Sequence, residues 1–344
     1  MSDLTKLSDQ LLKSDFDTIP LIDLTDAQSP NLEKRQALAE SIRDACLSAG
    51  FFYVKNHGVP LEVVNETFKQ SHSFFDLPSE VKMTVDINKS DNFRGYMRLL
   101  TSNTNPANKG DRHEAFNMGL DPLVHPESFH QDEKEGELKH SDNLWPIQED
   151  WEGAVGFKEA ALNYYKQVLA LGYKLFPLFA LALNLPEDFF EAKTQHPAAI
   201  MRLLFYPALG EQEVDELMPG IGAHTDFECF TILRQDEVSG LQVQNRKGEW
   251  IDAVPSPDTF IVNIGDQLSR WTNDIFVSTR HRVLPTIAKD RYSIPFFFGC
   301  DHEVPLLPPT TCVTEDRPAR YDVMTAGAYV HMRLSEIYAP AKDQ

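Results

Sequence analysis

Cysteine is scarce in this sequence, and its positions do not suggest a metal site. The chain of 344 residues contains four cysteines, with no Cys-x-x-Cys pair and no repeated spacing: Cys46, Cys229, Cys300 and Cys312. A disulfide framework or a structural zinc site is normally marked by closer or more regular spacing. We therefore expect reduced thiols, as in cytoplasmic proteins.

Basic residues are scarce relative to acidic ones. Lys and Arg together number 32 against 52 Asp and Glu, so the formal net charge is −20. A surface of this sign repels phosphate backbones and anionic membranes, and we therefore expect neither nucleic acid nor a membrane as a partner. An anionic small molecule is not excluded, because one buried arginine can dominate the field inside a pocket.

Long apolar runs are also missing. The sequence contains no stretch of about eighteen apolar residues, which is the length needed to span a bilayer. The first residues, Met-Ser-Asp-Leu-Thr-Lys, lack the features of a secretory signal. No heptad pattern or apolar stripe predicts an obligate protein partner. With a hydrophobic content of 42%, the chain is predicted to be an ordered cytoplasmic protein.

The apolar pattern that is present predicts an α/β start and a strand-rich second half. Helical spacing occurs at 31–49, 61–76 and 325–338, and a long helix at 151–184 is expected to bend or break at Pro177. Residues 86–150 are rich in turn-forming residues and predict loops. Short apolar segments between turn signals predict the strands of a sandwich or barrel: 19–24, 51–54, 200–206, 229–234, 241–244, 249–254, 259–264, 276–284 and 291–298.

A His-x-Asp pair is the first candidate for chemistry. His224 and Asp226 are two residues apart, and the side chains at i and i+2 of an extended strand point to the same face. His281 is the best candidate for a third ligand. Two histidines and one carboxylate on one face of an octahedron leave three open positions, which is the arrangement that iron(II) oxygenases use. With eleven histidines in the chain, the pair alone is a weak motif, and the assignment depends on its surroundings.

An Arg-x-Ser pair follows the third candidate ligand. Arg291 lies ten residues after His281, at the start of a predicted strand, and Ser293 shares its strand face. A guanidinium fork beside a hydroxyl suits the capture of a carboxylate. An ordinary ion pair is the alternative for Arg291 taken by itself.

These motifs and their surroundings resemble the isopenicillin N synthase-like family of iron(II)/2-oxoglutarate-dependent oxygenases. The resemblance runs from about residue 19 to 338 and is carried by His224-Thr-Asp226, by Ser278 with His281-Arg-Val283, and by Arg291-x-Ser293. Supporting stretches are Ile19–Leu24, Gly50–Gly58, Gly240–Val243, Gly248–Trp250, Val262–Asp266 and Trp271–Asn273.

The resemblance implies an α+β fold with a double-stranded β-helix, or jelly-roll, core and flanking helices. It divides the chain into an N-terminal α/β region (1–125), a polar loop and supporting helix (126–198), the jelly-roll core (199–305) and a C-terminal helical segment (306–344). It also implies Fe(2+), 2-oxoglutarate and O2, with hydroxylation, desaturation or demethylation of a small-molecule metabolite and release of succinate and CO2.

The resemblance further implies roles for single residues. His224, Asp226 and His281 would hold the iron. Arg291 and Ser293 would bind the distal carboxylate of 2-oxoglutarate, assisted by Tyr206. Leu204 stands where many members of the family carry Asn, so one polar contact to 2-oxoglutarate is missing.

Substrate-facing residues are less well marked. From their places in the family pattern, the residues predicted to contact substrate are Phe116, Asn117, Arg202 and Phe298. Alternation along a strand puts Phe296 and Phe298 on one face and Phe297 on the other, so that only one set can line the interior. Arg94 fits either the pocket entrance or an exposed loop.

Two other functions remain open from the sequence. One is an iron-dependent oxidase or cyclase that does not use 2-oxoglutarate, because an Arg-x-Ser pair can meet another carboxylate. The other is a catalytically silent ligand-binding protein on the same fold, since a fold does not dictate a function.

Overall fold

The computed structural model describes residues 4, 6–7, 15–105, 107–126, 143–210, 215 and 217–338, with side chains placed up to residue 333. Its helices are α2 (Leu32–Ser48), α3 (Leu61–Phe75), α4 (Ser79–Lys82), α5 (Ala154–Ala182), α6 (Asp266–Trp271) and α7 (Ala326–Tyr338). Short 3-10 turns lie at Leu24–Asp26, Met83–Val85, Ile87–Lys89, Glu191–Lys193 and Thr310–Cys312.

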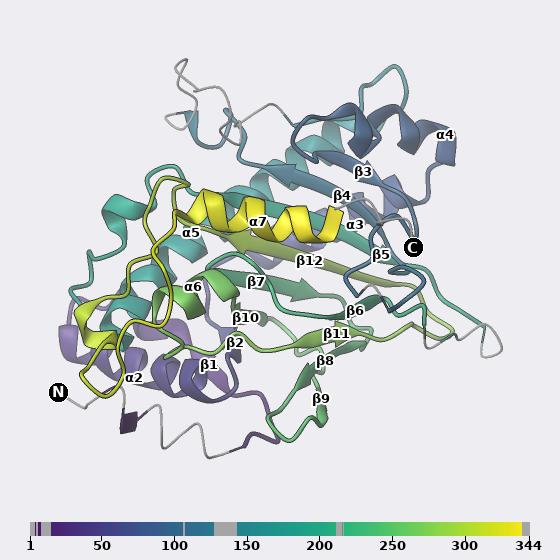
Figure 1. Cartoon of the computed structure of the whole chain (residues 1–344). Coiled ribbons are helices and arrows are strands. Elements are labelled where there is room, and N and C mark those ends of the chain that lie inside the picture. Colours follow the sequence, from purple (N-terminus) through teal and green to yellow (C-terminus); the bar gives the residue numbers. More distant parts are fainter. Residues whose placement is uncertain are drawn as a thin grey trace.

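The strands form two sheets that face each other (Figure 1). The larger sheet has eight strands, in the order β1 (Leu21–Asp23), β2 (Phe51–Lys55), β10 (Phe260–Ile264), β7 (Phe230–Gln235), β12 (Arg291–Phe298), β5 (Ala199–Tyr206), β4 (Glu114–Gly119) and β3 (Gly95–Met97). The smaller has four, in the order β6 (Ile221–His224), β11 (His281–Val283), β8 (Leu241–Gln244) and β9 (Trp250–Asp252). This arrangement confirms the predicted jelly-roll core with flanking helices.

The larger sheet joins parts of the chain that the sequence places in different regions. Strands β1 to β4 come from the N-terminal region, and they pair with strands of the jelly-roll core: β2 with β10, and β4 with β5. The N-terminal region therefore extends the same sheet instead of forming a separate unit. The predicted division of the chain into four regions therefore stays a prediction from the sequence.

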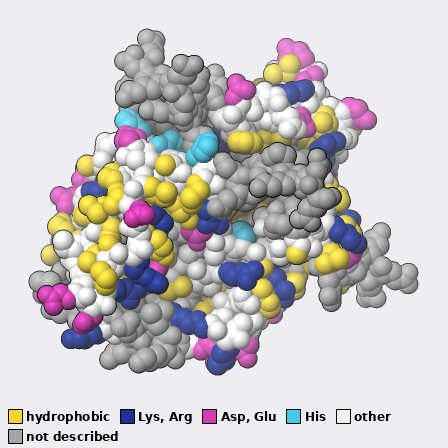
Figure 2. All heavy atoms as spheres, viewed as in Figure 1, with side chains coloured by type: hydrophobic (Ala, Val, Ile, Leu, Met, Phe, Trp, Pro, Cys, Tyr) yellow, Lys and Arg dark blue, Asp and Glu magenta, His cyan; other side chains and the backbone are white. Residues whose placement is uncertain are grey.

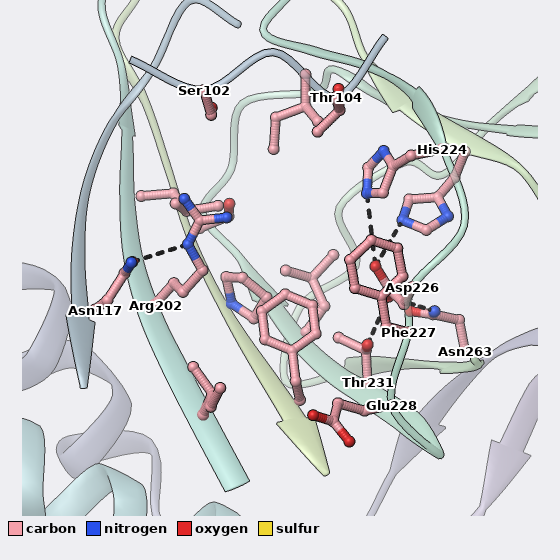
Figure 3. A pocket seen from close by; sticks show the side chains of 18 of the residues that line it. Ser102, Thr104, Asn117, Arg202, His224, Asp226, Phe227, Glu228, Thr231 and Asn263 are labelled. Atoms are coloured by element: carbon pink, nitrogen blue, oxygen red, sulfur yellow. Dashed lines mark hydrogen bonds and ion pairs between the residues drawn. The ribbon is translucent and has the colours of Figure 1, made fainter. Parts of the chain in front are cut away.

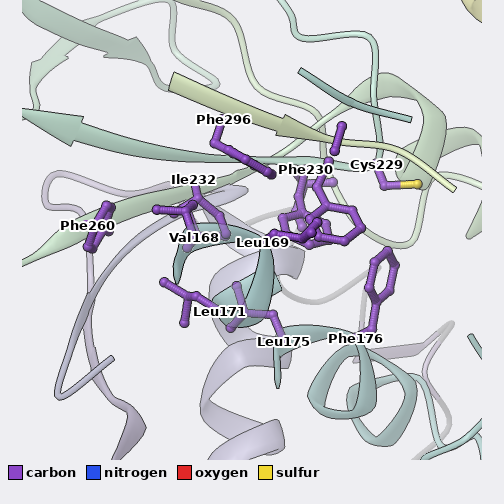
Figure 4. Packing of buried hydrophobic residues seen from close by; sticks show 14 of the residues in the cluster. Val168, Leu169, Leu171, Leu175, Phe176, Cys229, Phe230, Ile232, Phe260 and Phe296 are labelled. Atoms are coloured by element: carbon purple, nitrogen blue, oxygen red, sulfur yellow. The ribbon is translucent and has the colours of Figure 1, made fainter. Parts of the chain in front are cut away.

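Helix α5 packs on the outer face of the larger sheet and builds the main core. Its apolar side chains, including Val168, Leu175 and Phe176, belong to one buried cluster with side chains of the sheet, and the ring of Phe176 packs against that of Phe230 on β7 (Figure 4). Pro177 lies inside α5 without ending it, so the helix does not break there, which was one of the two outcomes that we expected. A proline inside a helix costs about 3 kcal/mol. Burial of the surrounding aromatic and aliphatic side chains against the sheet outweighs this cost.

A second, smaller core lies between the two sheets. It is formed by residues from both, including Phe51, Leu204, Tyr206, Val243 and Val283. Because side chains alternate along a strand, β5 and β10 each contribute to both cores. The space between the sheets is therefore lined by one side-chain set from each strand, and this set includes the candidate site.

Two predictions about local structure were wrong. Residues 86–150 contain strands β3 and β4, because the apolar residues Ala115, Phe116 and Met118 are buried there beside β5; residues 127–142 lie outside the described residues. The predicted strand 276–284 is restricted to His281–Val283. Its first part packs at the end of α6, where the backbone N–H of Phe276 donates to Oγ1 of Thr272.

Three features of the described residues bear on the wider predictions. All four cysteines are buried as free thiols, as expected. On the face shown in Figure 2, acidic and basic side chains are interspersed without a broad basic patch. None of the helices that the structure describes combines the length and apolar content needed to cross a bilayer.

Candidate metal and cosubstrate site

His224 and His281 are brought together by the pairing of two strands. His224 ends β6, and His281 begins β11, and in the antiparallel pairing of these strands the two residues lie directly opposite each other. Their ring centroids are 4.3 Å apart. Asp226 follows two residues after His224, and its Oδ1 lies 3.5 Å from Nε2 of each histidine. The three candidate ligand atoms all lie within 4.8 Å of one another (Figure 3).

Backbone hydrogen bonds orient both imidazole rings. Nδ1 of His224 lies 2.8 Å from the carbonyl oxygen of Gly222, and Nδ1 of His281 lies 3.1 Å from that of Thr279. A carbonyl can only accept, so each Nδ1 carries the proton and donates it. The lone pair of each Nε2 then points toward Asp226, as a metal ligand requires.

Asp226 presents one oxygen to the histidines and keeps the other bound. Its Oδ2 accepts hydrogen bonds from Oγ1 of Thr231 at 2.5 Å and from Nδ2 of Asn263 at 2.8 Å. Burial alone raises the pKa of this carboxyl, but the nearby imidazoles of His281 and His224 hold its pKa well below the ordinary value. Burial lowers the pKa of His281, but the charge of Asp226 outweighs this and raises it above its ordinary value. A bound cation would displace the imidazole proton, and the donor set would then be two imidazole nitrogens and an ionised carboxylate oxygen, which fits iron(II).

Arg291 is fully buried in the larger sheet and is held in place by three hydrogen bonds. Its Nε donates to the carbonyl of Val238, one terminal nitrogen donates to Oε1 of Gln235 at 2.8 Å, and the other to Oγ of Ser293 at 3.4 Å. The guanidinium also lies over the ring of Tyr206, 4.8 Å from its centroid. These bonds use three of the five N–H groups of an arginine, and two remain for a carboxylate.

The three candidate metal ligands and the buried Arg291 open onto one cavity of about 300 Å³ between the sheets. His224, Asp226 and His281 line one part of it, and Arg291, Ser293 and Tyr206 line another. A cavity of this size suits small molecules rather than polymers. Leu204, which pairs with Ser293, lines it together with other aliphatic residues: Ile221, Leu233, Leu241 and Val283.

A polar row lines a further wall of the cavity. Arg202 on β5 donates through Nε to Oδ1 of Asn117 on β4 at 2.9 Å, and a terminal nitrogen lies 3.3 Å from Nε2 of His113. Nδ1 of His113 lies 3.0 Å from the carbonyl oxygen of Gly220, so this nitrogen donates and Nε2 accepts from Arg202. Burial, the charge of Arg202 and the proximity of His224 lower the pKa of His113 to about 3. The imidazole is therefore neutral and fixes the guanidinium.

Known proteins match this chain over most of its length. Residues 19–148 match the family described as non-haem dioxygenase in morphine synthesis N-terminal, and residues 197–299 match the 2OG-Fe(II) oxygenase superfamily. A 2-oxoglutarate-Fe(II) type oxidoreductase of Metarhizium rileyi is 36% identical over 330 residues, covering 93% of this chain and 87% of that protein. The chain belongs to the 2OG-Fe(II) oxygenase superfamily.

Further relatives agree with this membership. Clavatol oxidase of Penicillium crustosum is 34% identical and covers 93% of this chain and 97% of its own. A full-length Neurospora crassa protein, crystallised with alpha-KG, superposes with a TM-score of 0.80 at 30% identity over 93% of this chain and 96% of its own. This 2OG-Fe(II) oxygenase is thus an enzyme that uses iron, 2-oxoglutarate and O2 to oxidise a small molecule, as the sequence predicted.

Two of the predicted substrate residues of this oxygenase do not face the cavity. Phe116 is fully buried against Phe74 and Phe157, on the side of the sheet that α3 and α5 cover. Phe298 is fully buried against Phe176 and Phe230 on the same side. Both predictions were wrong, because side chains alternate between the two faces of a strand and these two rings lie on the face that packs against the main core. Asn117 and Phe297, each one residue away, line the cavity.

The oxygenase cavity also contains polar residues that the sequence did not single out. His113 lies directly before β4 and four residues before Asn117, and this even spacing could have revealed it. His302 lines the cavity as well. Arg94 lines the cavity, so of its two predicted positions the structure favours the pocket over the exposed loop. Glu228 stands out as a charge within the apolar run Phe227–Phe230.

Proposed function

We propose that His224, Asp226 and His281 hold the iron of this oxygenase and that Arg291 and Ser293 bind the distal carboxylate of 2-oxoglutarate. The observation that carries the proposal is the convergence of three ligand atoms within 4.8 Å in the same cavity as a buried, immobilised arginine. Iron supplies the activation of O2 when it is bound, with 2-oxoglutarate as the reductant that becomes succinate and CO2.

The protein contributes position and exclusion of water. Asn263 and Thr231 hold Asp226 so that one oxygen faces the two histidines. The fork of Arg291 orients 2-oxoglutarate, and Tyr206 covers the guanidinium from the side. The aliphatic residues around Leu204 keep the space between carboxylate anchor and metal ligands dry, which strengthens the electrostatic interactions there.

The substrate is proposed to lie against the polar row formed by Arg202, Asn117 and His113. Two of the five N–H groups of Arg202 are used by Asn117 and His113, and three remain for a hydrogen-bond acceptor of the substrate. Phe297 on β12 and Phe227 add apolar area to the same cavity. A small molecule with an oxygen acceptor beside a C–H bond therefore suits the site.

The direct test is an anaerobic titration of the protein with iron(II) and then 2-oxoglutarate. Bidentate chelation by 2-oxoglutarate gives a visible charge-transfer band, which we expect in the wild type. Release of succinate upon admission of O2 with a metabolite panel then identifies substrates. An iron-dependent oxidase or cyclase would oxidise its substrate without the band and without succinate, and a silent ligand-binding protein would not consume O2 with any compound.

We also propose that the enzyme acts in the cytoplasm without nucleic acid or an obligate protein partner. The free thiols and the net charge of −20 support this proposal. Cell fractionation and sedimentation of the purified protein test it. Activity that depends on a second protein would contradict it.

A further inference from the structure

Glu228 is a buried carboxyl that the proposed chemistry does not use. It follows Asp226 by two residues, is 6% exposed, and lines the cavity. Its Oε2 is buried and has no hydrogen-bond partner among the described residues. In Figure 3 its carboxyl lies beyond Asp226 and Thr231, on the side of the view away from Ser102 and Thr104. Leaving a buried acceptor without a partner is unfavourable, so a ligand that donates a hydrogen bond to it gains affinity.

Arg94 lines the same cavity as Glu228, and it carries a buried donor where Glu228 carries a buried acceptor. Its Nε is buried and has no hydrogen-bond partner among the described residues. Arg94 and Glu228 attract each other electrostatically, but no hydrogen bond or ion pair between them is found in the part of the chain that the structure describes. An unsatisfied donor and an unsatisfied acceptor thus face one cavity without contacting each other.

Two glycines make room for these side chains. A Cβ atom on Gly299, just after β12, would lie 2.1 Å from Oε2 of Glu228. A Cβ atom on Gly119, at the end of β4, would lie 2.2 Å from a terminal nitrogen of Arg94. Real Cβ atoms do not approach so closely, so any other residue at either position would displace the carboxyl of Glu228 or the guanidinium of Arg94 from the cavity wall.

We propose that Glu228 and Arg94 form a subsite for an amide-type group of the substrate, with Glu228 accepting from its N–H and Arg94 donating to its carbonyl oxygen. The substrate class is then a small amide, lactam or ureide. A carboxyl oxygen accepts a hydrogen bond in either protonation state, and the assignment depends only on position. This inference rests on the proposed function, because it places the substrate in the cavity of the iron ligands.

The test compares amide compounds with counterparts in which the N–H is methylated. The full-length protein is loaded with Mn(II), which does not activate O2 here, and with 2-oxoglutarate, and binding is measured by calorimetry. We expect at least one lactam or ureide to bind, with its N-methyl counterpart at least tenfold weaker. In Glu228→Met, which has a side chain of similar length without an acceptor, we expect this difference to disappear. Glu62→Met, on the exposed face of α3, is the control and should retain it.

The same titrations separate failure of the subsite from failure of the proposed function. The affinity for 2-oxoglutarate should stay within about twofold in Glu228→Met, since Arg291 is untouched. If the wild type binds 2-oxoglutarate but no amide, or binds each amide and its N-methyl counterpart equally, the subsite is overturned alone. If the wild type binds no 2-oxoglutarate, the proposed function fails. Should Glu228→Met not fold, Gly299→Ala takes its place with the same expected loss.

Discussion

His224 and His281 are register partners on neighbouring antiparallel strands, so the backbone hydrogen bonds of the smaller sheet set the spacing of two metal ligands. Asp226 completes the group from a turn just beyond β6. A site built on paired strands is held more rigidly than one built on loops, because main-chain bonds must break before the ligands separate.

Removing the carboxylate ligand should abolish metal binding. Asp226→Ala leaves two histidines and an open position, and we expect the affinity for iron(II) to fall by more than about 100-fold, the upper end of the losses seen for residues that only support ligands. Anaerobic titration with iron(II) measures this, and succinate release should vanish in parallel. Asp316→Ala, at an exposed position, is the control. Turnover retained in Asp226→Ala would overturn the ligand assignment.

The residues that hold Asp226 should have a smaller, measurable effect. In Asn263→Ala the hydrogen bond to Oδ2 of Asp226 is lost, while the ligand itself remains. We expect a decrease of about 10- to 100-fold in iron affinity with the protein still folded. Unchanged affinity would show that the hydrogen bond from Thr231 alone suffices to orient the carboxylate.

Arg291→Lys should separate charge from geometry in the binding of 2-oxoglutarate. Lysine keeps the charge but lacks the fork, and it cannot reproduce the bonds to Val238, Gln235 and Ser293. We expect the KM for 2-oxoglutarate to rise about 10- to 100-fold, equivalent to about 1.5–3 kcal/mol for hydrogen bonds to a charged group. Iron affinity should stay unchanged. An unaltered KM would show that Arg291 does not bind 2-oxoglutarate.

Phe297 and Phe298 should respond oppositely to truncation. Phe298→Ala empties a tightly packed part of the main core, where the ring fills the space beside Gly172, and should cost about 3–5 kcal/mol of unfolding free energy. Phe297→Ala removes a ring from the cavity wall and should change which substrates are oxidised at a much smaller cost in stability. Urea unfolding and substrate competition measure the two effects, and the reverse pattern would show that the strand faces are assigned wrongly.

His113 should make the protein sensitive to acid. Its pKa is about 3 in the folded state, chiefly because of burial, and about 6.5 when unfolded, so the unfolded state binds the proton first. Stability is therefore lost as the pH falls from 6.5 toward 3, by as much as about 1.4 kcal/mol per pH unit. Urea unfolding of His113→Gln should show a shallower pH dependence over this range. An identical slope in wild type and variant would contradict the neutral assignment.

The sequence predicted the parts of the site that depend on local spacing. Arg291 and Ser293 lie two residues apart on β12, so strand alternation alone relates them. His224 and Asp226 have the same spacing, but β6 ends at His224, so the loop after the strand, and not alternation, brings Asp226 to the histidines. The fold class followed from the recurrence of short apolar strands and from the family resemblance. The continuity of α5 through Pro177 did not follow, because it depends on packing against the sheet.

The remaining parts depend on tertiary contacts that spacing does not encode. Which face of β12 looks into the cavity depends on the face that α5 covers, and for this reason Phe298 was assigned instead of Phe297. Strand β4 was missed because its residues lie within a stretch dominated by turn formers. Arg94 and Glu228 come from segments distant in sequence that meet only at the cavity, so their relation appears only in the structure.

Strand β12 carries alternating duties along its length: Arg291, Ser293, Pro295 and Phe297 line the cavity, while Tyr292, Ile294, Phe296 and Phe298 are buried in the main core. The residues proposed to bind 2-oxoglutarate, Arg291 and Ser293, lie at the beginning of the strand, and Phe297, which lines the proposed substrate space, lies near its end. Replacements at Pro295 or Phe297 can therefore accumulate with little loss of stability and without disturbing the use of 2-oxoglutarate. An enzyme built in this way can diversify its substrates by changes at alternate positions of a single strand.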